Sequence, residues 1–327
     1  MGVKSLIAGP PFHEKFLSTI IRPKGKLDKA ILAPPLTSNY QLVGIAFDYL
    51  LRFYLERLNA GSRTSVWAAE EGVLLLDAFE GASDKFLKAK GYLDGARNLY
   101  LSFIQDGLLT DELIRAALCL AHLEGTRRSG VFNEADLVTV DERDIADLRQ
   151  LMSLVREQDF SSRKACYLNP TFGSTRSNAD LIIDDRLIEI KTIKNLVLDR
   201  RHLHQLVQYY ILLSLEGIDA GRKRPINYFE EECEVNRICI YFARHGYLHL
   251  MKIGDLIRPE LLAGFVKWYI EATRPLEDDR LAYCRRCYGL VPKGIVKEIQ
   301  AARRLKQKKA TKRKSLRRGS FGQNVDG

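Results

Sequence analysis

The segment Asp180–Lys191, with the sequence DLIIDDRLIEIK, decides the fold of this 327-residue chain. Two short apolar runs flank the pair Asp184-Asp185, and aspartate is one of the residues that favour tight two-residue turns between strands. If this pair forms the turn of a hairpin, Asp180 lies directly opposite Glu189. Residues opposed in this way on antiparallel strands project from the same face of the sheet. The segment therefore predicts a hairpin with two facing carboxylates.

Lys191 adds a third charge to the same face, because it follows Glu189 by two residues. Facing carboxylates destabilise a sheet, and charges on an apolar strand cost free energy unless they are paired or bound to a metal. A divalent cation between the acids removes this conflict, and carboxylate oxygens with water suit Mg²⁺ or Mn²⁺. The alternative is a salt-bridge ladder of Asp180, Glu189 and Lys191 on an exposed strand.

The elements after the hairpin indicate a mixed α/β core. We expect strands at Ala179–Ile183 and Arg186–Ile193, then a helix at Arg201–Glu216. Two further strands are expected at Arg237–Ala243 and Tyr247–Ile253, and a helix at Pro259–Thr273. The core is thus a mixed sheet flanked by helices.

The chain ahead of the hairpin has helical spacing of apolar residues. A cap signal at Ser38-Asn39 opens a helix that runs to about Leu58, and a nearly all-helical stretch follows it. The helices expected there are 64–79, 84–106, 111–128 and 140–157. Thr139-Val-Asp-Glu142 predicts a capping box for the last of them.

The residues Ala179-Asp180 and Glu189-Ile190-Lys191 resemble the signature of the PD-(D/E)xK nucleases, with alanine in place of the proline. The resemblance implies a restriction-endonuclease-like sheet and a metal-dependent enzyme that hydrolyses the phosphodiester bonds of DNA. Asp180, Glu189 and the carbonyl of Ile190 would be the metal ligands. Lys191 would orient the attacking water or offset charge on the phosphate.

Two further segments resemble the RecB-like branch of these nucleases. Gln205-Leu-Val-Gln-Tyr209 resembles its Gln-x-x-x-Tyr helix, in which both side chains lie on one side. Gly44-Ile-Ala-Phe47-Asp48 resembles its Gly-x-x-Phe-His helix, with Asp48 in place of histidine. The resemblance implies that Gln205 and Tyr209 position substrate or metal-bound water, and that Asp48 is a further metal ligand.

Three other polar residues have two interpretations each. His202 and His204, next to the Gln/Tyr pair, are either phosphate contacts or ordinary capping and surface residues. Glu124 is either a solvated helix end or a metal ligand.

These features predict five regions along the chain. They are an extended, proline-containing lead-in at 1–38, the first core helix at 39–58, a helical subdomain at 59–164, the nuclease core at 165–290 and a basic, disordered tail at 291–327. On this interpretation the helical subdomain is inserted between the first core helix and the catalytic hairpin.

The net charge of +10 is concentrated in the tail, because residues 301–318 contain ten Lys and Arg and no acid. Such a segment favours contact with the phosphate backbone without sequence choice. The residues expected to bind nucleic acid are Arg176, Arg303, Arg304, Lys308, Lys309, Lys312, Arg313 and Lys314. The other interpretation of the tail is a solubilising end.

The location and partners follow from composition. Without an apolar run of membrane-spanning length or a secretory signal, we expect a cytoplasmic protein with no membrane contact. Cys284 and Cys287 have metal-ligand spacing but no second pair, so free cysteines are favoured. Three alternatives stay open: a non-catalytic nucleic-acid-binding module on a nuclease fold, a ribonuclease, and a nuclease whose helical subdomain binds a protein partner.

Overall fold

The computed structural model describes residues 27–64, 67–80, 83–129, 131–172, 177–216, 218–219 and 235–257, with the single residues 18, 20, 21, 23 and 264. Four predictions lie outside these residues: the phosphate contact at Arg176, the helix at Pro259–Thr273, the Cys284/Cys287 pair and the basic tail. No helix in the described part of the chain is long and apolar enough to cross a membrane.

A six-stranded mixed sheet organises the described chain, in the order β1-β2-β5-β6-β8-β9. β1 pairs with β2 and β6 with β8 in parallel, and the other neighbours are antiparallel. The strands are β1 (Arg63–Thr64), β2 (Cys166–Leu168), β5 (Leu181–Ile183), β6 (Arg186–Lys191), β8 (Arg237–Phe242) and β9 (Tyr247–Lys252). The mixed α/β architecture is therefore confirmed.

The hairpin of β5 and β6 has the predicted turn and register. Asp184 and Asp185 form the turn, Ile182 pairs with Leu187, and Leu181 pairs with Ile188. The ladder stops there, one residue short of the predicted pair of facing carboxylates. The reason is that Asp180 lies in a bend, where its side chain rather than its backbone contacts β6.

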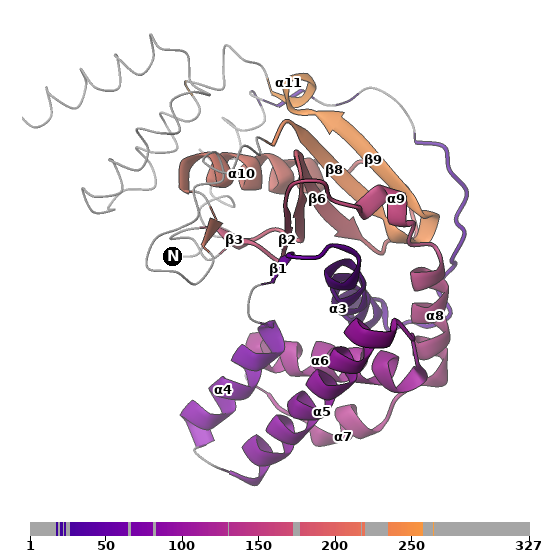
Figure 1. Ribbon diagram of the computed structural model, residues 1–327, viewed down its shortest axis with the longest axis vertical. Coiled ribbons are helices and arrows are strands. Elements are labelled where there is room, and N and C mark those ends of the chain that lie inside the picture. Colours follow the sequence, from indigo (N-terminus) through magenta and orange to yellow (C-terminus); the bar gives the residue numbers. More distant parts are fainter. Residues whose placement is uncertain are drawn as a thin grey trace, which may run out of the picture.

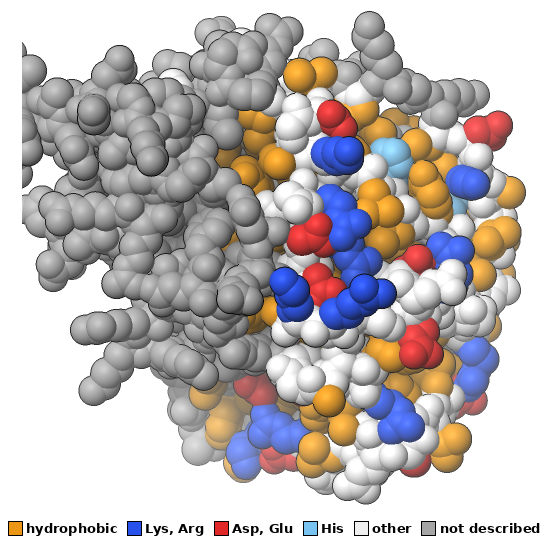
Figure 2. All heavy atoms as spheres, turned by 45° about the horizontal axis from the view of Figure 1, so that its top comes forward, with side chains coloured by type: hydrophobic (Ala, Val, Ile, Leu, Met, Phe, Trp, Pro, Cys, Tyr) orange, Lys and Arg blue, Asp and Glu red, His pale blue; other side chains and the backbone are white. Residues whose placement is uncertain are grey.

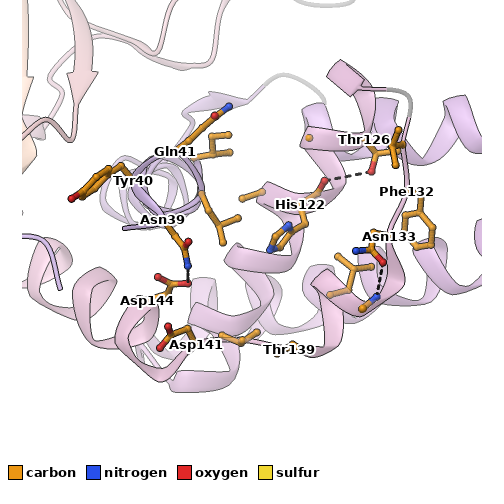
Figure 3. A pocket seen from close by; sticks show the side chains of 18 of the residues that line it. Asn39, Tyr40, Gln41, His122, Thr126, Phe132, Asn133, Thr139, Asp141 and Asp144 are labelled. Atoms are coloured by element: carbon orange, nitrogen blue, oxygen red, sulfur yellow. Dashed lines mark hydrogen bonds between the residues drawn. The ribbon is translucent and has the colours of Figure 1, made fainter. Parts of the chain in front are cut away.

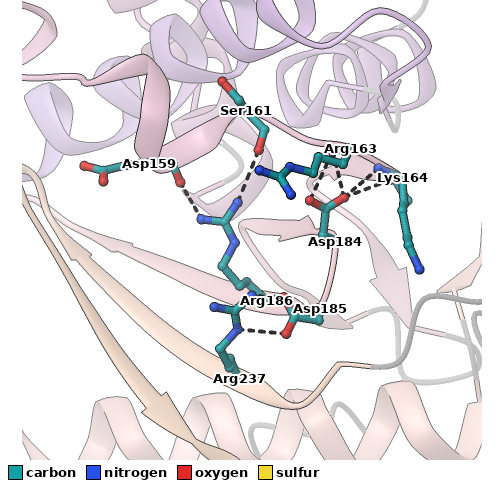
Figure 4. A network of polar contacts seen from close by, with 9 residues as sticks. Asp159, Ser161, Arg163, Lys164, Asp184, Asp185, Arg186 and Arg237 are labelled. Carbon is teal, nitrogen blue, oxygen red and sulfur yellow. Dashed lines mark hydrogen bonds and ion pairs between the residues drawn. The ribbon is translucent and has the colours of Figure 1, made fainter.

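The turn end of this hairpin is held by a polar network (Figure 4). The Asp184 carboxylate accepts the backbone N–H groups of Arg163, Lys164 and Ala165, which lowers its pKa despite the cost of partial burial. Arg186 donates to the carbonyl of Asp159. These contacts hold the turn end of the hairpin in place. Asp180 and Lys191 lie at the opposite end of the hairpin, where the β5–β6 ladder stops.

Two helices cover the two faces of the sheet. α3 (Tyr40–Leu58) shares a buried cluster with Leu181 and Ile188, whereas α10 (Arg200–Glu216) shares another with Ile182 and Leu187. Successive strand residues point to opposite faces, so one hairpin contributes to both clusters.

A helical block lies on the α3 side of the sheet, with α3 between the two (Figure 1). Its helices are α4 (Ala68–Glu80), α5 (Asp84–Asp106), α6 (Asp111–Ser129), α7 (Glu134–Val138) and α8 (Glu142–Ser153), followed by α9 (Glu157–Phe160). Apolar residues of the block belong to the same buried cluster as α3 and the strands.

Some local expectations were wrong. The capping box at Thr139 is absent because Thr139 is the C-cap of α7, which was not predicted, and Asp141 caps α8 by accepting from the N–H of Arg143. The strands of a second small sheet were also missed: β3 (Thr171–Phe172), β4 (Ser177–Asn178) and β7 (Ile218–Asp219). α11 (Ile253–Leu256) replaces the expected last residue of β9.

A buried ion pair joins the block to the sheet. Arg244, in the 3₁₀ turn η3 (Ala243–His245) between β8 and β9, donates to both carboxylate oxygens of Asp147 on α8 at 2.8 and 3.0 Å. Its Nε also donates to the carbonyl of Thr192, the residue after Lys191, at 2.9 Å. One guanidinium therefore connects α8 with the end of β6.

Candidate active site

Asp180 is a partly buried carboxyl, and it lies just beyond the end of the β5–β6 ladder. Its Oδ2 accepts the backbone N–H of Ile190 at 2.6 Å. Burial and the nearby charge of Glu189 raise its pKa to about 7, although Lys191 and the Ile190 hydrogen bond lower it. An acid with this pKa is protonated for much of the time at neutral pH unless a cation compensates its charge.

Glu189 and Lys191 form an ion pair on β6. Glu189 is only 2% exposed, and Lys191 Nζ donates to its Oε1. Burial raises the pKa of Glu189, as does the charge of Asp48, while Lys191 and Gln205 lower it. Its Oε2 is buried and has no hydrogen-bond partner among the described residues, which is uncommon for a buried carboxylate.

Asp48 reaches the same region from α3. Burial raises its pKa to about 7, and the charges of Asp180 and Glu124 act in the same direction against the lowering effect of Arg52. Its Oδ2 accepts from Arg52 Nη2 at 2.6 Å, while its Oδ1 is buried without a partner in the described part of the chain. The structure thus brings Asp48 together with the two carboxyls of the hairpin.

A glycine allows α3 to lie against the end of β6. A Cβ on Gly44 would be 2.8 Å from Oγ1 of Thr192, closer than such atoms come in proteins. Gly44 is one turn before Asp48 on the same side of the helix. The absence of a side chain at Gly44 therefore permits the contact that places Asp48 near Glu189.

α10 contributes the predicted glutamine and tyrosine. Gln205 Nε2 donates to the Tyr209 hydroxyl at 2.9 Å, and burial together with Glu189 and Asp180 raises the pKa of Tyr209. His202 is on α10, and its Nδ1 is buried without a partner among the described residues. Burial and Lys191 lower the pKa of His202, so its ring is neutral near Lys191. His204 is buried, which excludes a surface role.

Arg52, which the sequence did not single out, and Glu124, which it did, complete the group. Arg52 is buried beside Asp48, and its guanidinium lies 4.5 Å from the centre of the Tyr49 ring. The i, i+4 spacing of Asp48 and Arg52 is the signal that identifies such a pair on a helix. Glu124 is buried and accepts from the Tyr49 hydroxyl, so it is not a solvated helix end.

The charges of this group fit a divalent cation. Asp48, Glu124, Asp180 and Glu189 carry four negative charges when ionised, and Arg52 and Lys191 carry two positive ones, which leaves a net charge of −2. The unpartnered oxygens of Asp48 and Glu189 are hard ligands of the kind that Mg²⁺ and Mn²⁺ prefer. In the described residues no three His, Cys, Asp or Glu side chains already enclose an ion site.

A separate pocket lies away from these carboxyls, between α3, α6, α7 and α8 (Figure 3). Its volume is about 1040 Å³, and Asn39, His122 and Asp144 are among the residues that line it. None of the candidate site residues described above is among them. This pocket and the candidate site are thus lined by different residues.

The face drawn in Figure 2 has interspersed acidic and basic side chains among its described residues. The described part of this face therefore has no extended basic area of the kind that binds a phosphate backbone. The expected phosphate contacts in the tail and at Arg176 lie outside the described residues.

Comparison with protein-family models, with curated proteins and with solved structures finds no match for this chain.

Proposed function

We propose that this protein is a metal-dependent nuclease that hydrolyses DNA phosphodiester bonds on a restriction-endonuclease-like core. The observation that carries the proposal is the meeting of Asp48, Asp180 and Glu189 beside Lys191. They come from α3, from the bend before β5 and from β6. Buried acids that raise one another's pKa destabilise a fold, and such a violation of folding logic is expected at a functional site.

The three carboxyls would hold Mg²⁺ or Mn²⁺, which polarises a phosphate and lowers the pKa of bound water. Lys191 is held by Glu189 in this structure. If Glu189 were a cation ligand, Lys191 would be free to donate to a non-bridging phosphate oxygen and would offset its negative charge. Gln205 and Tyr209 already form a hydrogen-bonded pair near Glu189, so they are placed to orient substrate or water.

The competing proposal is a nucleic-acid-binding module on the same fold. Paired acids repel phosphate, so a surface used only for binding gains nothing from burying Asp180 and Glu189 together. The presence of both acids beside Lys191 therefore favours catalysis over binding alone.

The test is a cleavage assay of the full chain on single- and double-stranded DNA and RNA, with and without Mg²⁺ or Mn²⁺. Wild type should cleave DNA only with the cation, and Asp180→Asn and Lys191→Ala should each lose about 100-fold or more in rate, the usual cost of removing one such group. Exposed residues of the same types provide controls: Asp94→Asn on α5 and Lys252→Ala on β9 should retain full activity.

Three other results of the cleavage assay would change the proposal. Cleavage that persists in Asp180→Asn and Lys191→Ala would overturn the site. Binding of DNA without cleavage by the wild type would favour the non-catalytic module. Cleavage of RNA alone would keep the site and change the substrate.

A further inference from the structure

The helical block reaches the candidate active site through Glu124 of α6. The Tyr49 hydroxyl donates to Glu124 Oε2 at 3.1 Å and accepts the N–H of Ala69, the second residue of α4, at 3.1 Å. Three helices therefore meet at one phenol. Glu124 is buried, so its charge interacts with its neighbours with little screening by solvent.

Arg52 interacts electrostatically with Glu124 and with Asp180 of the hairpin. Its Nη2 and Nε donate to Oδ2 and the carbonyl of Asp48, and its guanidinium lies over the Tyr49 ring. Burial lowers the pKa of Arg52, but the charges of Asp48, Glu124 and Asp180 outweigh this effect and raise it. This buried cation thus has two carboxylates on the α3–α6 side, Asp48 and Glu124.

A cation bound by Asp48 would compete with Arg52 for the same carboxylate. Loss of the partner carboxylate costs several-fold more free energy for a buried arginine than for an exposed one, because the buried charge is left uncompensated. A second anion close to Arg52 removes that cost. Glu124 is placed to be this anion.

We propose that Glu124 is a positioning residue, and that it compensates Arg52 when Asp48 exchanges Arg52 for a divalent cation. The helical block then supplies a charge that the cation site requires, without contacting the cation itself. This inference rests on the proposed function, since it assumes that Asp48 binds a cation.

The test measures cation binding without turnover. Tb³⁺ replaces the divalent cation in the metal-free full chain, and its luminescence is excited through nearby aromatic rings such as Tyr49 and Trp67, whose centroids are 6.3 Å apart. Displacement by Mg²⁺ gives the affinity for the natural class of ion. Glu124→Gln, which retains an acceptor for Tyr49 but loses the charge, should weaken Tb³⁺ binding about tenfold.

A double-mutant cycle distinguishes this role from a general effect of charge on the site. In an Arg52→Gln background, Glu124→Gln should change Tb³⁺ affinity less than about twofold, because no buried cation remains to be compensated. Glu70→Gln on α4 is the control, since Glu70 pairs with Arg97 at the surface of the same block. In the cleavage assay, Glu124→Gln should raise the Mg²⁺ concentration needed for half activity and leave the rate at saturating Mg²⁺ near that of wild type.

Results that contradict the role of Glu124 differ from a result that refutes the proposed function. An equal loss of Tb³⁺ affinity from Glu124→Gln with and without Arg52 would overturn the proposal, as would no loss at all. If Glu124→Gln does not fold, folding of the Arg52→Gln/Glu124→Gln variant supports the proposal, and its failure to fold contradicts it. Absence of Tb³⁺ binding by the wild type would instead refute the proposed function on which the inference rests.

Discussion

At the scale of single residues, the unusual feature of the protein is the protonation of its buried acids. Asp48 and Asp180 are partly buried, and desolvation of their carboxyls raises the pKa of each to about 7. A carboxyl with a raised pKa holds its proton more tightly in the folded than in the unfolded chain. Its contribution to stability is therefore complete below about pH 4 and is lost as the pH rises to about 7.

The first prediction concerns Asp180→Asn in the presence of EDTA. Asparagine retains an oxygen that can accept from the Ile190 N–H but carries no charge. The variant should be more stable than wild type at pH 8 by on the order of 3 kcal/mol, and about equal to it at pH 4. Urea unfolding at the two pH values measures the difference.

Asp94→Asn on the surface of α5 serves as the control and should show no such dependence on pH. Added Mg²⁺ should stabilise the wild type at pH 8 and have little effect on Asp180→Asn. A stability difference between Asp180→Asn and wild type that is constant from pH 4 to 8 would contradict the raised pKa.

At the scale of elements, the site depends on how closely α3 approaches the end of β6. The second prediction is that Gly44→Ala lowers cleavage about tenfold or more, because a small displacement at a catalytic centre has a large effect on rate. Its new Cβ would displace Thr192, which is 2.8 Å away. Thr192→Ala removes that oxygen, so the double variant Gly44→Ala/Thr192→Ala should recover most of the activity. Failure of Thr192→Ala to rescue Gly44→Ala would show that this contact is not the cause.

The junction between α8 and η3 carries the third prediction. The side chains of Arg244 and Asp147 are 1% and 0% exposed, so Asp147→Ala leaves a buried guanidinium without its carboxylate. The expected loss in the free energy of unfolding is about 3–5 kcal/mol. The exposed pair of Arg149, also on α8, and Asp111 on α6 provides the control, and Asp111→Ala should cost less than about 1 kcal/mol. Equal losses in urea unfolding would contradict a structural role for Arg244.

The elements that local pattern determines were predictable, and those that depend on distant contacts were not. The turn at Asp184-Asp185 fixed the register through Leu181 and Ile188, since the length of a hairpin turn determines which residues of its two strands lie opposite each other. Thr139 matched a cap by spacing alone, but packing of the unpredicted helix α7 moved the cap to Asp141. Two-residue strands such as β1 are too short to show a period.

The candidate site likewise contains some residues whose proximity local sequence predicted and others that only distant contacts bring together. Asp180, Glu189 and Lys191 lie within twelve residues, so their proximity followed from the hairpin alone. The placement of Asp48 rested on a resemblance, and Arg52 was missed because nothing local distinguishes a buried arginine on a helix from an exposed one. Only the fold shows that Glu124, 75 residues from Tyr49, bonds to it.

At the scale of the whole molecule, the helical block and the sheet share one buried cluster through α3. The fourth prediction is that they unfold together. With Trp268 replaced by Phe, Trp67 of the block is the one tryptophan in the chain, and it packs against the rings of Tyr49, Phe53 and Tyr100. Its fluorescence change in urea should coincide with the loss of hydrogen-exchange protection in β8. A lower midpoint for Trp67 would mean that the block unfolds independently.

The fifth prediction concerns the basic residues at the end of the chain. A protein ending at Gln300 lacks the ten Lys and Arg of 301–318 and should bind DNA more weakly, with a smaller dependence on salt. Its cleavage rate at saturating DNA should equal that of the full chain. Binding isotherms at 50 and 200 mM salt measure the change, and an unchanged salt dependence would show that the tail does not contact phosphate.

The excess stability expected of Asp180→Asn has a consequence for how such a protein changes over generations. Either codon for aspartate becomes a codon for asparagine by one transition at its first base. A lineage that is no longer under selection for DNA cleavage would therefore gain stability at neutral pH from the single substitution Asp180→Asn. The rest of the core and the surface would be unchanged. Inactive descendants of this chain should accumulate quickly wherever selection for cleavage ceases, and the persistence of the aspartate would itself record that selection.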